Sequence, residues 1–138
     1  MRISRRGSNA IEFALLAPLY TAFMMGIIDY SWMVYQTSSV TAATQAGCRS
    51  ASMLDPGQNE TQMSAVYAAA NAKMKSNLVA TGLPCSGGCF QATLAVGTYP
   101  NRAIRCDLRM PFQSLTGFSP TPNNINSRAV VRLEYQRR

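Results

Sequence analysis

The sequence predicts an α+β protein made of a long N-terminal transmembrane helix, a second helix and a small antiparallel sheet of about three strands. Three observations support this fold class. The chain carries no charge from Phe13 to Ile28, small and apolar residues then recur at three- and four-residue steps, and from Phe90 onward apolar and polar residues alternate. The first pattern is typical of a membrane segment, the second of helices and the third of half-buried strands.

The first helix is expected to run from about Ser8 to Leu54. Tyr30, Trp32 and Tyr35 fit an aromatic belt at the outer rim of a membrane. The sixteen uncharged residues before Asp29 are fewer than the roughly 20 that span a bilayer. We therefore expect Asp29 either to lie near the outer head groups, with local thinning of the bilayer, or to pair with another subunit within it.

Pro18 lies inside this helix and opposes the carbonyl of Ala14, which predicts a bend or a locally melted turn. The alternative is a harmless kink in which a neighbouring hydroxyl, such as that of Thr21, satisfies the freed carbonyl. Beyond the membrane the helix is expected to bury one narrow face of mostly small residues: Val40, Ala43, Thr44, Gly47, Cys48, Ala51 and Leu54.

Asp55-Pro56-Gly57 is expected to end the first helix, and the second is expected to begin near Asn59, with Gln62 completing a capping box. Gly82-Leu83-Pro84 is a typical helix stop. The predicted buried stripe of this second helix consists of Met63, Val66, Tyr67, Ala70, Met74 and Leu78.

Three segments alternate with the period of a strand and are expected to place one face against the helices. Their inward residues are Phe90, Ala92, Leu94 and Val96; then Ile104, Cys106, Leu108, Met110 and Phe112; then Ala129, Val131, Leu133 and Tyr135. Residues 97–101 are a short hairpin connection. The stretch from Gln113 to Ser127 is interpreted as a long exposed loop, and either as a contact or adhesion surface or as simple irregularity.

Composition limits the possible functions. The formal charge of +7 falls to +4 if Arg2, Arg5 and Arg6 are removed with a leader. A basic surface attracts DNA, anionic lipid or polysaccharide, but scattered solvated arginines explain this charge equally simply. The chain has no histidine, which excludes Ser-His and Cys-His catalysis and the commonest metal ligand. We expect no enzymatic activity, no cofactor and no metal site.

All four cysteines follow the apolar segment, on the side where an oxidising compartment favours disulfides. Cys48 lies on the inward stripe of the first helix and Cys106 on the inward face of its strand, which predicts a Cys48–Cys106 bridge. Cys85 and Cys89 flank Ser-Gly-Gly, which is flexible enough for a local ring. Three pairings are possible in principle, and a zinc site is the alternative.

The N-terminus holds the most informative motif. Arg2, Arg5 and Arg6 are expected to keep it in the cytoplasm. Glu12 lies at the inner edge of the apolar run, where burying a carboxylate costs about 2.5–3.5 kcal/mol on insertion scales. A secretory signal is cut after its apolar core, whereas the processing signal here, Gly7 after two arginines, precedes it. Cleavage at Gly7 would release the basic leader and keep the helix.

Gly7, then four residues, then Glu12-Phe13 at the head of an apolar helix resembles the processing site of type IV-like prepilins. The fuller pattern resembles the TadE-like minor pilins, or pseudopilins, of tight-adherence (Flp-type) pilus systems. It comprises residues 7–20 with Pro18, then Gly26-Ile-Ile-Asp29, then Ala43 and the run Ala46-Gly47-Cys48-Arg49. The specific resemblance covers about the first 50 residues, and beyond them it rests on architecture.

The resemblance implies a prepilin leader at 1–7, a transmembrane assembly helix at 8–35 and an extracytoplasmic α+β domain at 36–138. It also implies cleavage between Gly7 and Ser8 by a prepilin peptidase, docking through Glu12 and Phe13, and extraction by an inner-membrane assembly platform. The partners would be other pilins, namely a major Flp-type pilin and a second minor pilin.

In that interpretation the chain is a single-pass protein of the bacterial inner membrane, with its N-terminus cytoplasmic and its C-terminal domain periplasmic. It later reaches the pilus or cell surface, where it helps to initiate or cap a pilus used in adhesion. An alternative function for Glu12 is to cap the helix N-terminus, which is favourable with the helix dipole.

Two other functions fit parts of the sequence. A single-pass, membrane-anchored extracytoplasmic binding module outside any fibre explains the anchor but neither Gly7 nor Glu12. A pilus-associated DNA or surface receptor is favoured by five arginines, although alternate arginines on strands point to solvent in any case. They are Arg102, Arg105, Arg109, Arg128 and Arg132. No aromatic platform accompanies them, so we do not expect nucleic-acid binding.

Overall fold

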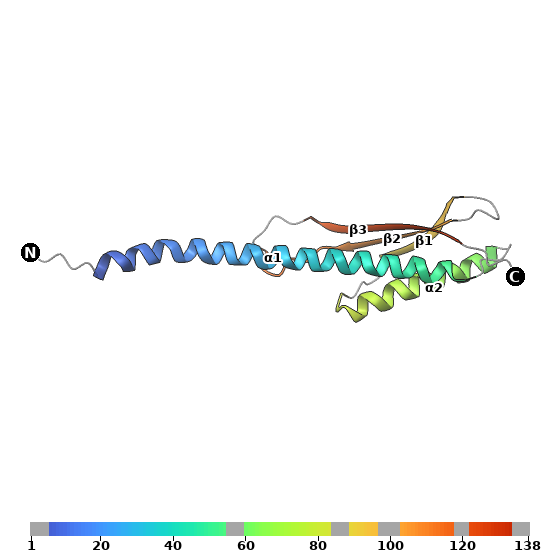
Figure 1. Cartoon of the computed structure of the whole chain (residues 1–138), viewed down its shortest axis with the longest axis horizontal. Helices are drawn as coiled ribbons and strands as arrows, with labels where there is room; N and C mark the ends of the chain where they lie inside the picture. The colour runs from blue at the N-terminus through green and yellow to red at the C-terminus, as the bar shows by residue number, and fades with distance from the viewer. Residues whose placement is uncertain (1–5, 55–59, 84–88, 97–102, 118–121, 134–138) are drawn as a thin grey trace, which may run out of the picture. The chain divides into compact units, whose positions relative to one another are not determined.

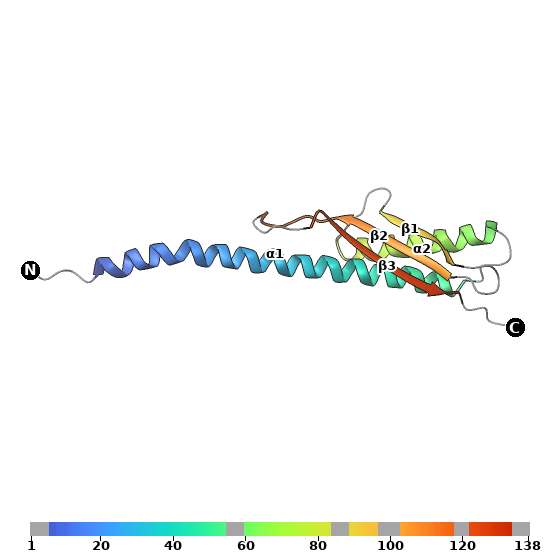
Figure 2. The same ribbon diagram turned by 90° about the horizontal axis from the view of Figure 1, so that it is seen from above.

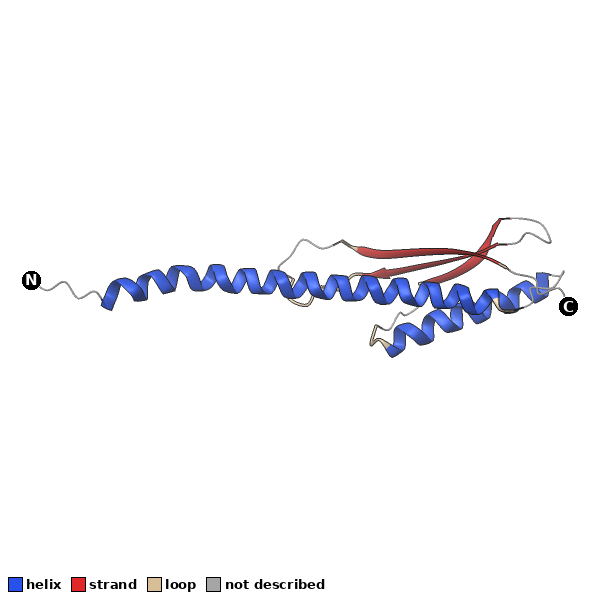
Figure 3. Ribbon diagram, viewed as in Figure 1, coloured by secondary structure: helices blue, strands red, loops and turns tan. Residues whose placement is uncertain are grey.

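The computed structural model describes residues 6–54, 60–83, 89–96, 103–117 and 122–133. In chain order the elements are α1 (Arg6–Ser52), α2 (Glu60–Ala80), β1 (Phe90–Val96), β2 (Ala103–Pro111) and β3 (Asn124–Arg132), as Figures 1 and 3 show. The predicted α+β class, with a long N-terminal helix, a second helix and a small antiparallel sheet, is confirmed. The chain divides into two compact units, residues 1–34 with 113–121, and residues 35–112 with 122–138.

The three strands of the second unit form one antiparallel sheet in the order β1-β2-β3. Phe90 pairs with Leu108 across the first strand pair, and Asp107 pairs with Arg128 across the second. Side chains on the central strand β2 alternate as predicted, because Ile104, Cys106, Leu108 and Met110 are buried. One face of the sheet therefore belongs to the core.

Both helices cover that face. The C-terminal part of α1 and all of α2 lie on the same side of the sheet in Figures 1 and 2. The buried residues that they contribute are Val40, Ala43, Thr44, Cys48 and Ala51 from α1, and Met63, Val66, Ala70, Met74 and Leu78 from α2. The two predicted stripes are thus confirmed except at their margins. Tyr67 is half-buried, and Leu54 is exposed because α1 ends at Ser52.

Gly47 lies where α1 comes closest to α2. A Cβ atom at this position would lie 3.0 Å from the carbonyl oxygen of Ala70 and would overlap the side chain of Met74. Both neighbours belong to the buried stripe of α2. The small residue at this position therefore sets how close the two helices can lie.

The predicted disulfide between Cys48 and Cys106 is present, with a Cα–Cα distance of 5.9 Å. It joins α1 to β2 across a sequence separation of 58 residues. In the chain-entropy description, closing a loop of that length restricts the unfolded chain by about 4 kcal/mol. Cys89 is also disulfide-bonded. Its predicted partner, Cys85, lies outside the described residues, so that pairing stays a prediction.

The stop signal after α2 acts through a glycine in the left-handed region. Gly82 has φ of +72°, a conformation that glycine adopts without steric cost. The amide of Leu83 donates to the carbonyl of Leu78, and the amide of Gly82 donates to that of Val79, both at 3.0 Å. This is the Schellman pattern, and Leu83 is buried beyond the helix end as that pattern favours.

The prediction that the loop from Gln113 extends to Ser127 was wrong at its C-terminal end. Strand β3 begins at Asn124 and pairs Asn124 with Pro111 and Ile125 with Met110. Ile125 is buried, and it extends the same inward alternation that reaches Leu133. The polar residues Asn124, Asn126 and Ser127 are typical of a loop, so the sequence did not indicate a strand here. Pairing with β2 satisfies their backbone groups, and their side chains stay partly solvated.

Several predicted local signals lie outside the described residues. They are the helix stop at residues 55–57, the cap at Asn59, the hairpin at residues 97–101 and Tyr135.

The contact at Gly47 yields a stability prediction. Gly47→Ala gains helix propensity of up to about 1 kcal/mol, but the added methyl group overlaps Met74 and forces α1 and α2 apart. We expect a net loss of about 1–3 kcal/mol in the free energy of unfolding. Gly26→Ala is the matched control, since nothing lies within 4 Å of its Cβ position. Thermal unfolding of the full chain in detergent measures both, and an unchanged midpoint for Gly47→Ala would contradict the close-contact argument.

Candidate functional site: the N-terminal helix

The N-terminal part of α1 exposes large apolar side chains around its circumference. Ile11, Phe13, Leu15, Leu16, Leu19, Tyr20, Phe23, Ile27 and Ile28 all leave 46% or more of their surface uncovered. Phe13, at 74%, is the most exposed of them. An apolar surface of this extent is typical of a segment covered by lipid or by other protein chains.

By length and composition, α1 is the one helix among the described residues that is able to cross a membrane, over residues 10–52. None of its most apolar 18-residue window is buried by the chain itself. A core helix of a soluble domain would be mostly buried. The long apolar helix near the N-terminus thus has the character of a membrane anchor.

The two residues of the predicted cleavage site, Gly7 and Ser8, lie in the first turns of α1. Glu12 follows Ser8 by four residues in the same helix, and this spacing places the two positions on one face, a single turn apart. The Glu12 side chain is exposed. Among the described residues it forms no hydrogen bond and no ion pair. Its carboxylate is therefore available to a group outside this chain.

Pro18 lies within an unbroken helix. The locally melted turn that the sequence allowed is thus not found. Thr21 does use its hydroxyl on the backbone, but it donates to the carbonyl of Pro18 at 2.9 Å rather than to that of Ala14. Proline has no N–H to offer the carbonyl four residues before it, so the backbone ladder is interrupted at Ala14 while the helix continues.

Asp29 is the second acidic residue of the apolar segment, and it is fully buried. Thr116 covers it: the backbone amide donates to Oδ1 at 2.9 Å and the hydroxyl donates to Oδ2. Nearby, the indole N–H of Trp32 donates to the carbonyl of Gln113 at 3.0 Å. Residues 113–117 therefore pack on α1 around Asp29, within the first compact unit.

Thr116 thus gives Asp29 a partner within its own chain, which the sequence did not identify. Neither lipid head groups nor another subunit is needed to satisfy the carboxylate, because the chain supplies two donors of its own. Two of the three residues of the predicted aromatic belt form hydrogen bonds within the chain, and the belt itself stays a prediction. Trp32 hydrogen-bonds residue 113, and the Tyr35 hydroxyl donates to the carbonyl of Thr81 at 2.9 Å. Tyr30 is the most exposed of the three predicted belt residues.

Sequence reasoning named Asp29 but missed Thr116. The two residues are 87 positions apart, and threonine in a polar stretch carries no signal of a long-range partner. The one usable signal was the cost of a carboxylate in an apolar segment, which demands a partner without identifying it.

The family model described as TadE-like protein matches residues 7–49, just under a third of the chain. The matched segment contains Gly7, Ser8, Glu12, Pro18 and Asp29, and it confirms the resemblance predicted from the sequence. No curated protein and no solved structure matches the chain.

The contact with Asp29 predicts how firmly residues 113–117 are held. Thr116→Val keeps the shape of the side chain but removes the hydroxyl donor. A hydrogen bond to a charged group contributes about 1.5–3 kcal/mol, so amide exchange of residues 113–117 should accelerate about tenfold or more. Thr116→Ser keeps the donor and should preserve protection. Hydrogen exchange in lipid nanodiscs decides this, and equal exchange in the wild type and the valine variant would show that the hydroxyl contributes nothing.

Proposed function

We propose that this TadE-like chain is a minor pilin, cut by a prepilin peptidase between Gly7 and Ser8, that takes part in initiating or capping a tight-adherence pilus. The observation that carries the proposal is the contrast between the two acids that flank the uncharged stretch from Phe13 to Ile28. Asp29 is buried and satisfied within the chain, whereas Glu12 is exposed on an apolar helix directly after the cleavage motif.

Cleavage would give Glu12 a partner. The new α-amino group of Ser8 would be positively charged at neutral pH and would lie one helical turn from the carboxylate. An amine and a carboxylate attract strongly in a low-dielectric environment, and each offsets part of the burial cost of the other. Formed between two chains, the same pair fixes the axial register of an incoming helix against its neighbour.

The apolar surface of α1 suits a helix that is transferred from a membrane into a fibre. In the membrane its exposed leucine, isoleucine and phenylalanine side chains contact lipid tails, and in a fibre they would contact neighbouring helices. Both environments are apolar, so the hydrophobic term changes little in the transfer. A directional polar interaction such as that of Glu12 then decides which helix docks and at what height.

In this proposal residues 8–35 form the membrane and assembly segment, and residues 36–138 form the extracytoplasmic domain. The domain carries a disulfide between Cys48 and Cys106, which fits an oxidising compartment. The N-terminus would begin in the cytoplasm, where Arg2, Arg5 and Arg6 favour it. The partners would be a major pilin, a second minor pilin, the prepilin peptidase and the inner-membrane platform.

An anchored binding module that never enters a fibre is the competing function. It accounts for the apolar helix and for the folded domain. It gives no reason to place an exposed carboxylate at Glu12, because an anchor that contacts only lipid is more stable without it. The state of the N-terminus and the behaviour of Glu12 variants separate the two functions.

We expect the mature chain to begin at Ser8. Gly7 has no side chain, and a bulky residue before the scissile bond should block the peptidase. Gly7→Leu should therefore accumulate as an uncut precursor without pilus function, while Gly26→Leu, the same change within the helix, should still be cut. Intact mass spectrometry of membrane-extracted protein gives the answer. A chain that retains residues 1–7 in cells with working pili would refute processing at this site.

We expect Glu12→Gln to be cut and folded normally but to lose incorporation with partner pilins, because an amide cannot form the ion pair with an α-amino group. If Glu12 only caps the helix, the variant should lose about 0.3–1 kcal/mol of stability and assemble normally. Glu60→Gln is a control that removes the same charge from α2. Co-purification with tagged partner pilins reads out assembly, and wild-type recovery of Glu12→Gln would exclude docking.

A further inference from the structure

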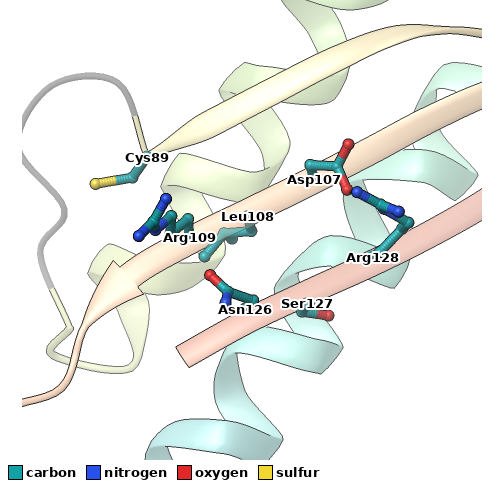
Figure 4. A pocket seen from close by; sticks show the side chains of 7 residues that line it. All are labelled: Cys89, Asp107, Leu108, Arg109, Asn126, Ser127 and Arg128. Carbon is teal, nitrogen blue, oxygen red and sulfur yellow. The ribbon is translucent and has the colours of Figure 1, made fainter. Parts of the chain in front are cut away.

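A pocket lies over strands β2 and β3 of the sheet. It has a volume of about 620 Å³, which is within the range of small-molecule sites. Figure 4 shows the side chains that line it: Cys89, Asp107, Leu108, Arg109, Asn126, Ser127 and Arg128. They come from β2, from β3 and from the residue before β1. The pocket thus belongs entirely to the second compact unit.

The strand register brings two guanidinium groups to this pocket. Arg109 pairs with Asn126 and Asp107 pairs with Arg128, so that Arg109 and Arg128 are diagonal neighbours on adjacent strands. Diagonal positions of an antiparallel pair lie about 7–8 Å apart. Side chains as long as arginine are able to converge on one group across that distance. The outward direction of both is set by the buried alternation of β2 and β3.

The two arginines differ in their ion pairing. The Nε atom of Arg128 donates to Oδ1 of Asp107 at 2.6 Å, while 66% of the Arg128 side chain stays exposed. The structure records no ion pair for the guanidinium of Arg109 among the described residues. In Figure 4 the Asn126 side chain lies next to Arg109, on the opposite side of the pocket from the Asp107–Arg128 pair. Arg109 is therefore the cation free to bind a ligand.

The net charge of Arg109, Arg128 and Asp107 indicates the charge of the ligand that the pocket favours. Two guanidinium groups and one carboxylate leave a net charge of +1, which matches a monoanion, such as a carboxylate or a phosphodiester, better than a phosphate monoester with its charge of about −1.5 to −2. The planar guanidinium fork fits the two oxygens of a carboxylate. Asn126 adds an amide that both donates to and accepts from hydroxyl groups.

No aromatic side chain lines the described part of the pocket. Single-stranded nucleic acids are usually held by bases stacked on aromatic residues, so the lining does not favour them. Hydroxyl groups with a carboxylate among them are the chemistry of acidic sugars. We propose that the pocket binds the carboxylate of an acidic saccharide, with Arg109 as the main anion ligand and Asn126 as a hydroxyl contact.

The proposal goes beyond the pilin function and does not depend on it, because neither Gly7 nor Glu12 takes part. The probe is a galacturonic acid tetramer, titrated by calorimetry into the full chain in detergent. The same tetramer with its carboxylates methyl-esterified is the chemical control, and a short single-stranded oligodeoxynucleotide tests the competing class. We expect binding of the free acid and none of the ester.

Variants locate the binding. Arg109→Gln should weaken it about tenfold, the loss of one charge-assisted contact. Arg132→Gln is the matched control, since it removes the same charge from an exposed position on β3 that does not line the pocket. It should change the affinity less than twofold. Asn126→Asp adds a negative charge inside the pocket and should abolish binding. Asn126 is exposed, so this variant should keep the fold.

Three outcomes would overturn the proposal. Equal binding of ester and acid would show that the carboxylate is not recognised. Equal losses for Arg109→Gln and Arg132→Gln would indicate a diffuse basic surface instead of a site. Tighter binding of the oligodeoxynucleotide than of the tetramer, lost in Arg109→Gln, would assign the pocket to nucleic acid.

Discussion

The close approach of α1 to its neighbours at Gly47 and Cys48 is the contact on which the folded domain depends. Gly47 leaves no side chain between α1 and α2, and Cys48 on the next position bonds covalently to the central strand. Two successive residues of one helix thus fix its distance to the second helix and to the sheet. The stripe of small residues along α1 is the consequence, because larger side chains would hold these layers apart.

The same helix faces two environments, and its sequence changes accordingly. From Val40 to Ala51 it has one buried stripe, whereas around Phe13 and Phe23 it exposes apolar side chains in every direction. No break in the helix separates the two regimes. Apart from the bond that Pro18 removes, the helical backbone satisfies its own hydrogen bonds in lipid and in protein alike, so one helix can serve as both anchor and core element.

Glu12 and Asp29 are both carboxylates next to the apolar stretch, but they differ in their hydrogen-bond partners. Both Glu12 and Asp29 would be costly in lipid if left alone. Asp29 has two donors from Thr116 in its own chain, and its cost is offset in the monomer. Glu12 has no such contact among the described residues. The described part of the chain offers Glu12 no such partner, which is the ground for our proposal that Glu12 acts in assembly and Asp29 in local structure.

Sequence by itself determined the α+β class, the long first helix and the inward faces of α1, α2 and β2, and it favoured the Cys48–Cys106 bridge among three possible pairings. These features follow from local periodicity and from the requirement that inward cysteines meet across a shared core. Tertiary structure alone decided the start of β3, the partner of Asp29 and the diagonal placement of Arg109 and Arg128 on adjacent strands. Each of these depends on strand register or on a contact between distant segments, and polar residues such as Asn124 and Thr116 look the same in sequence whether they are paired or solvated.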